Sequence, residues 1–204
     1  MNTALQHEVG QFRAWAVGHE DSYGEWECDY SNWPSFWAAA RDAIEQSQID
    51  PLDDIDLLNL LYALGRDNEI ECIRRHLIHF PALLRQLSLR ATDLSDDAAC
   101  WQIAVSISEA KLTDSASLLT PYLTHSNEYV RRRALIALAS VDPTRAEEIA
   151  IRNLTDSFEY TRIAALTVLA DVGSLKTHAA ATRMLNDPNE YVRANADKIL
   201  KSTV

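Results

Sequence analysis

The chain has 204 residues, of which 30 are Asp or Glu and 19 are Lys or Arg, so its formal net charge is −11. Its 5 glycines and 6 prolines are too few for the tight turns of a β-sandwich or barrel, which favours helices. The acidic balance disfavours nucleic acid as a partner, because phosphates are bound by clustered Lys and Arg, and it favours a basic partner.

The acidic excess is confined to one half of the chain. Residues 1–102 contain 18 acidic and 7 basic side chains, whereas residues 103–204 contain 12 of each. The cysteines are Cys28, Cys72 and Cys100, which are far apart and have no CxxC spacing, so we expect reduced thiols and a cytoplasmic protein. We expect no membrane association, because residues 1–20 lack the apolar stretch of a signal peptide and no apolar run reaches 18 residues.

Two helices are predicted before residue 50. Leu5, Val9, Phe12 and Ala16 lie on one face of the first, and the second covers residues 34–46. We expect residues 1–49 to form an N-terminal cap on the rest of the chain.

An acidic and aromatic segment lies between these helices. Large rings are typical anchors of protein interfaces, but rings are also needed to cover the open end of a helical stack, and both interpretations stay open here. Acidic side chains continue further along the N-terminal half. The candidate partner-binding residues are Glu20, Asp21, Tyr23, Glu25, Trp26, Glu27, Asp29, Tyr30, Trp33, Asp53, Asp54, Asp93, Asp96 and Asp97.

Further helices are predicted over residues 50–117. Asp50 and Pro51 are typical of a helix start, and Gly65 of its end. Asn68 is expected to cap a helix that ends before Pro81, residues 82–90 form another, and Ser95 is expected to cap the next. We interpret this region as degenerate helical repeats.

Residues 118–204 contain a repeat. Glu-Tyr-x-Arg occurs three times, with tyrosines 31 residues apart at Tyr129, Tyr160 and Tyr191. Leucines stand six residues before and nine residues after each tyrosine, and an alanine stands five residues after it. Apolar spacings of 3, 4 and 7 predict an amphipathic helix in each repeat, preceded by a polar corner. The tyrosines are expected either to form a row along one edge or to pack over the next corner.

The repeats resemble the HEAT-repeat family, in which an apolar helix, a corner with Asp or Pro, and a helix that opens with Val-Arg follow one another. The resemblance implies an all-α fold: a right-handed superhelical stack of antiparallel helical hairpins, clear over residues 118–204. We expect the non-repeat cap, the degenerate repeats and these repeats to form one continuous domain. It also implies a ladder between corner aspartates and arginines six residues later. The matching residues are Asp156 with Arg162 and Asp187 with Arg193, whereas His125 replaces the Asp before Arg131.

We expect no enzymatic chemistry, cofactor or metal. Phosphate-binding loops and serine-nucleophile motifs are absent from the sequence. Cys72, His76 and His79 share a helical face but lack a fourth ligand.

The function that fits best is an immunity protein: a small inhibitor that binds a basic toxin, such as a secreted nuclease, through an acidic and aromatic surface. The binding site of a nuclease must attract phosphate and is therefore positive, so its inhibitor is expected to be acidic. Two alternatives stay open. One is a relative of the HEAT-like DNA glycosylases, and the other is an assembly scaffold for a different basic partner, with the oligomeric state undetermined.

Overall fold

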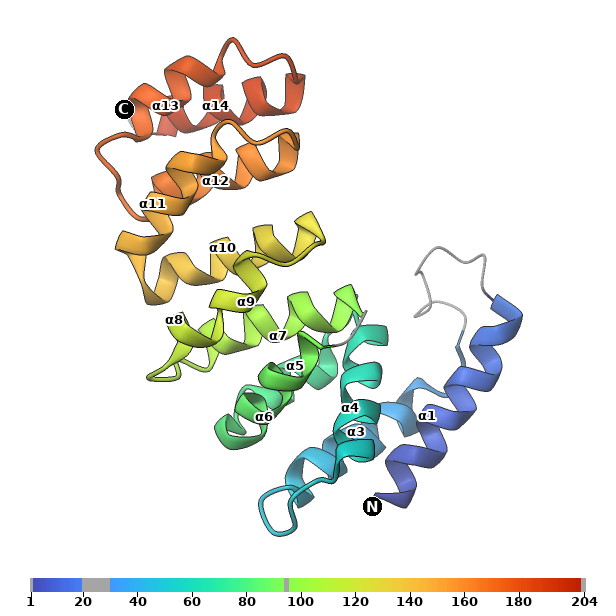
Figure 1. Cartoon of the computed structure of the whole chain (residues 1–204). Helices are drawn as coiled ribbons and strands as arrows, with labels where there is room; N and C mark the ends of the chain where they lie inside the picture. Colours follow the sequence, from blue (N-terminus) through green and yellow to red (C-terminus); the bar gives the residue numbers. More distant parts are fainter. Residues whose placement is uncertain (1, 20–29, 94–95, 203–204) are drawn as a thin grey trace. The chain divides into compact units, whose positions relative to one another are not determined.

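The fold is all-α, as the composition predicts. The computed structural model describes residues 2–19, 30–93 and 96–202, and these form α-helices and one 3-10 turn, with no strand among them. The helices belong to two compact units, Met1–Leu112 and Thr113–Val204 (Figure 1). The expected cap at residues 1–49 shares unit 1 with most of the expected degenerate repeats.

Unit 1 contains six α-helices among its described residues. Both helices predicted before residue 50 are confirmed, and α4 packs against α1, α6 and α7. Its core includes Leu5, Phe12, Phe36, Leu60 and Leu84, all fully buried. In chain order the elements are α1 (Thr3–Ala16), η1 (Val17–His19), α3 (Trp33–Gln46), α4 (Asp54–Arg66), α5 (Cys72–Leu77), α6 (Pro81–Ala91) and α7 (Asp97–Glu109).

The helix starts in unit 1 differ from the predicted ones. The prediction that Asp50 caps α4 is wrong, because Asp53 fills that role and accepts a hydrogen bond from the Asp56 amide at 2.9 Å. Asp96 caps α7 through the Ala99 amide at 3.1 Å, whereas the predicted cap Ser95 lies outside the described residues. Each observed cap stands immediately before the first residue of its helix, where its oxygen reaches the first free backbone amides.

The start of α5 is capped from a distance. The predicted cap, Asn68, precedes the helix by four residues, and the residue next to the helix, Glu71, has a φ of 56°. The buried carboxylate of Asp67 accepts instead from the Ile73 amide at 2.6 Å and from the Trp37 indole at 3.0 Å. These two hydrogen bonds link the end of α4 to the start of α5 and to α3.

Gly65 does not end α4, which continues to Arg66. The structure shows a different reason for a glycine here. A Cβ atom at this position would lie 2.7 Å from Oδ1 of Asp96, which is closer than van der Waals contact allows. The glycine therefore permits the close approach of the α7 cap to α4.

Unit 2 contains the three repeats, and its predicted helices are confirmed. The helices that open with Glu-Tyr, namely α10, α12 and α14, pack against one another in order (Figure 1). On one side of this row α11 contacts α10 and α12, and α13 contacts α12 and α14. The elements are α8 (Ser115–Leu118), α9 (Thr120–Leu123), α10 (Glu128–Val141), α11 (Pro143–Asn153), α12 (Glu159–Asp171), α13 (Thr177–Met184) and α14 (Glu190–Ser202).

Candidate functional site

An aromatic cluster occupies the N-terminal part of unit 1. The Phe12 ring is fully buried and lies 4.8 Å from the Tyr30 ring, 5.3 Å from the Trp33 ring and 5.3 Å from the Phe36 ring, between centroids. Only 8% of Tyr30 and 5% of Trp33 is exposed. These two candidate binding residues therefore lie in the core of unit 1 rather than on its surface, as the capping interpretation expects.

Seven of the other candidates lie outside the described residues. They are Glu20, Asp21, Tyr23, Glu25, Trp26, Glu27 and Asp29.

The remaining acidic candidates lie around α4, and most of them have structural roles. Asp53 caps α4, and its backbone-amide hydrogen bond lowers the pKa of its carboxyl group. Asp54 forms an ion pair with Arg90. At the other end of α4, Asp96 caps α7 and pairs with Arg66 at 2.6 Å. The carboxylates thus form two groups at opposite ends of a 13-residue helix, about 18 Å apart.

Asp93 and Asp97 complete this set. Asp93 follows α6 and Asp97 opens α7, and both side chains are exposed. Asp97 lies in the first turn of its helix, where the helix dipole favours a negative charge.

The ion pairs do not remove the negative charge of unit 1. Residues 1–112 carry 19 acidic and 8 basic side chains, whereas residues 113–204 carry 11 of each. Even if every base in unit 1 paired with one carboxylate, eleven carboxylates would have no basic partner. The whole net charge of −11 therefore belongs to one compact unit.

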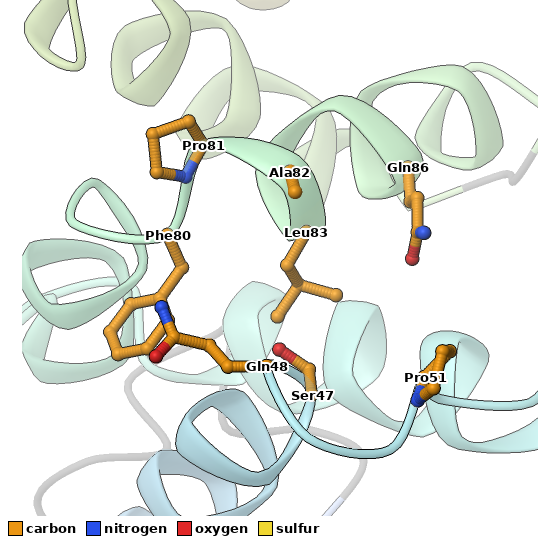
Figure 2. Close-up of a pocket in the computed structure, with 8 residues that line it drawn as sticks. All are labelled: Ser47, Gln48, Pro51, Phe80, Pro81, Ala82, Leu83 and Gln86. Carbon is orange, nitrogen blue, oxygen red and sulfur yellow. The ribbon is translucent and has the colours of Figure 1, made fainter.

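A small cavity opens where α3 ends and α6 begins. Its volume is about 290 Å³, near the lower limit for a ligand pocket. Figure 2 shows Phe80 and Leu83 beside Ser47 and Gln48, with Pro51 and Gln86 to one side. None of its lining residues is ionisable, and the Ser47 hydroxyl donates to the Ile44 carbonyl at 2.6 Å. The lining therefore offers hydroxyl and amide groups, but no acid or base that titrates.

The described cysteines are not activated as nucleophiles. Burial raises the pKa of Cys72, and it raises that of Cys100 to about 12. The Cys100 thiol donates to the Ala91 carbonyl at 3.1 Å. His76, which shares a helical face with Cys72, lies 3.2 Å from the Glu45 carboxylate and against the Phe80 ring.

The repeat tyrosines form an exposed row in unit 2. Tyr129, Tyr160 and Tyr191 are the second residues of α10, α12 and α14, and they are 38%, 46% and 57% exposed. The Arg132 guanidinium lies 4.8 Å from the Tyr129 ring centre and 5.2 Å from that of Tyr160. The two rings are therefore no more than 10 Å apart. Sequence reasoning found the tyrosines but not this arginine, because helical spacing alone does not show that it reaches the neighbouring repeat.

The polar corners of unit 2 contain the expected arginines. Arg131, Arg162 and Arg193 each donate from Nη1 to the carbonyls six and five residues earlier, at 2.7–3.1 Å. These bonds use backbone oxygens, so His125 in the first corner does not prevent them. The His125 Nδ1 atom accepts from the Asn127 amide at 3.1 Å, as the Asp187 carboxylate accepts from the Asn189 amide at 2.9 Å.

One carboxylate joins two successive corners. Arg162 donates to both oxygens of Asp187, in the next repeat, at 2.8 and 2.7 Å. The Asp156 carboxylate accepts instead from the Phe158 amide at 2.8 Å. Arg162 donates to the backbone carbonyl of Asp156 and not to its side chain. Arg193 likewise donates to the backbone carbonyl of Asp187 and not to its carboxylate. The side-chain pairing therefore runs from the arginine of one repeat to the aspartate of the following one.

None of the helices in the described part of the chain combines the length and apolar character needed to cross a bilayer. No protein-family model matches the sequence, and a comparison with curated proteins gives no match. Membership of the HEAT-repeat family stays a prediction.

Proposed function

We propose that the chain is a protein-binding helical-repeat scaffold of the HEAT type, and more specifically an immunity protein that neutralises a basic toxin in the cytoplasm. In this proposal the hairpins of unit 2 form a right-handed stack, and the chain has no catalytic activity of its own. The exposed row of tyrosines on parallel helix starts supports a binding role, because large rings that packing does not require are typical of protein interfaces.

We propose a basic partner because the net negative charge is confined to one of the two units. Unit 1 holds the entire net charge of −11 and unit 2 is neutral. A unit with eleven unneutralised carboxylates produces a negative potential that accelerates its encounter with a positive surface. A nuclease toxin has such a surface at its phosphate-binding site.

The test uses the product of the gene directly upstream, because an immunity gene follows its toxin gene. We expect this product to inhibit growth when expressed alone and to be inactive when expressed together with the chain. The purified pair is expected to associate quickly at low salt and more slowly as salt screens the charges. A neighbour that is neither toxic nor bound would refute the proposal, and binding of duplex DNA at low salt would favour the glycosylase alternative.

Two matched variants test the role of unit 1. Asp42 and Asp93 are exposed in unit 1, and Glu148 and Asp171 are exposed in unit 2. Changing both residues of the first pair to lysine is expected to lower the association rate and its salt dependence. The same change in the second pair should have a much smaller effect, since unit 2 is neutral. Equal effects of the two variants would contradict the assigned role of unit 1.

A further inference from the structure

Arg132 fills a slot between two tyrosines. Its guanidinium lies within cation–π distance of the Tyr129 and Tyr160 rings, at 4.8 and 5.2 Å. A carboxylate completes the slot, because Glu128 Oε2 lies 3.5 Å from Arg132 Nε. An arginine of this chain thus shows which groups receive a guanidinium at this point of the repeat: two rings from successive helices and one glutamate.

The next repeat retains the receiving groups but lacks the arginine. Thirty-one residues after Arg132 the chain has Ile163, which carries no charge. The receiving groups at the same register are Glu159, Tyr160 and Tyr191. The rings of this second slot are the two more exposed ones, at 46% and 57%.

The carboxylate of the second slot is free to accept a cation. No basic side chain within the described ranges forms an ion pair with Glu159. Its nearest basic neighbour along α12, Arg162, is bound to both oxygens of Asp187 and to two corner carbonyls. Glu159 and Arg162 attract each other electrostatically, but the hydrogen bonds of that arginine go to Asp187 and the corner carbonyls, so the Glu159 oxygens accept no hydrogen bond from it.

We propose that the slot formed by Glu159, Tyr160 and Tyr191 binds the side chain of an arginine supplied by a partner protein. The planar guanidinium stacks on the rings as Arg132 does in the preceding repeat, and Glu159 accepts its N–H groups. Arginine fits better than lysine, because a flat, weakly hydrated cation stacks on aromatic faces, whereas an ammonium is a compact and strongly hydrated charge. The inference relies on the proposed function only for the source of the arginine.

The test uses N-acetyl-arginine amide, which presents the side chain without charged ends. Titration into the full chain, followed by NMR of the tyrosine rings, is expected to shift the Tyr160 and Tyr191 signals saturably at millimolar concentration. N-acetyl-lysine amide is expected to bind more weakly. Binding of this small molecule does not depend on the protein partner, so a failed search for the toxin leaves the result valid.

Two substitutions at the same register separate the slot from unspecific binding. Ile163→Arg supplies the cation from within the chain and is expected to abolish the shifts. Ala194→Arg places an arginine at the equivalent position of α14, where by analogy with Arg132 it would contact Tyr191 but not enter the space between Tyr160 and Tyr191, so the Tyr160 shifts should remain. Glu159→Gln keeps the shape of the slot and is expected to weaken binding roughly two- to fivefold. The proposal is overturned if the wild-type rings do not shift, if lysine binds as well as arginine, or if Ile163→Arg, folded by circular dichroism, binds as the wild type does.

Discussion

The ion pair between Arg162 and Asp187 is predicted to be the main polar link between successive corners of unit 2. Both residues are 9% exposed, and the guanidinium donates to both carboxylate oxygens. Removing one member of such a buried pair leaves the other charge without compensation, a loss of about 3–5 kcal/mol. Asp187→Asn retains an acceptor for the Asn189 amide, so we expect destabilisation near the lower limit, about 3 kcal/mol.

The repeat provides a matched control. Asp156→Asn changes the corresponding residue one repeat earlier, whose carboxylate accepts a backbone amide but no guanidinium. Because asparagine also accepts that bond, we expect a loss of less than about 1 kcal/mol. Urea unfolding followed by far-UV circular dichroism measures both variants. Tryptophan fluorescence reports on unit 1 alone, because all five tryptophans precede residue 113.

The effect of Asp187→Asn has a definite pH dependence. The hydrogen bonds from Arg162 hold the pKa of the Asp187 carboxyl group below its ordinary value. The pair therefore stabilises the fold fully above the unfolded pKa, about 3.9, and this contribution is lost as pH falls through the lower folded pKa. The stability difference between wild type and variant should be constant near neutral pH and shrink below about pH 4. Equal losses for the two aspartates, or a difference that persists unchanged in acid, would refute this reasoning.

Three further substitutions test the packing in the two units. Thr161 is 2% exposed, and its hydroxyl has no hydrogen-bond partner. The equivalent residues in the other repeats are Val130 and Val192. Thr161→Val is therefore expected to raise the free energy of unfolding, measured in urea, by about 1 kcal/mol. Gly65→Ala should lower it by about 1–3 kcal/mol, because the added Cβ would meet the Asp96 carboxylate, and a thermal melt with no shift would exclude that clash. Phe12→Ala should lower it by about 3–5 kcal/mol and weaken the near-UV circular dichroism of the tryptophans around it, whereas an unchanged spectrum would contradict the central place of this ring.

Periodicity predicted the helices of unit 2 well, because a helix that buries one face needs apolar residues at fixed spacings. Caps were less predictable, since several residues near each helix start have suitable side chains. The choice of Asp53 over Asp50 depends on which carboxylate reaches a free amide. The cap from Asp67 to α5 is not visible in sequence, because it depends on a turn that brings the two residues together.

The candidate binding residues were predicted from composition, and composition does not show which way a side chain faces. Tyr30 and Trp33 are of the residue types that often anchor interfaces, yet they are buried around Phe12. Asp54 and Asp96 are acidic, but each has an arginine partner in the fold. Such pairing does not change the net charge of unit 1, so the net charge still supports a basic partner.

Comparing the same position in the three repeats distinguishes residues that the fold requires from residues with a specific role. Arg131, Arg162 and Arg193 recur because every corner requires donors for its carbonyls. The tyrosines also recur, although they are exposed and form no part of the buried core. The position directly after the corner arginine differs between the repeats: it is Arg132 in the first, Ile163 in the second and Ala194 in the third. A residue that varies beside constant, exposed rings changes what those rings can bind while leaving the packing intact. The difference between Arg132 and Ile163 is therefore a better guide to ligand binding in unit 2 than any residue that all three repeats share.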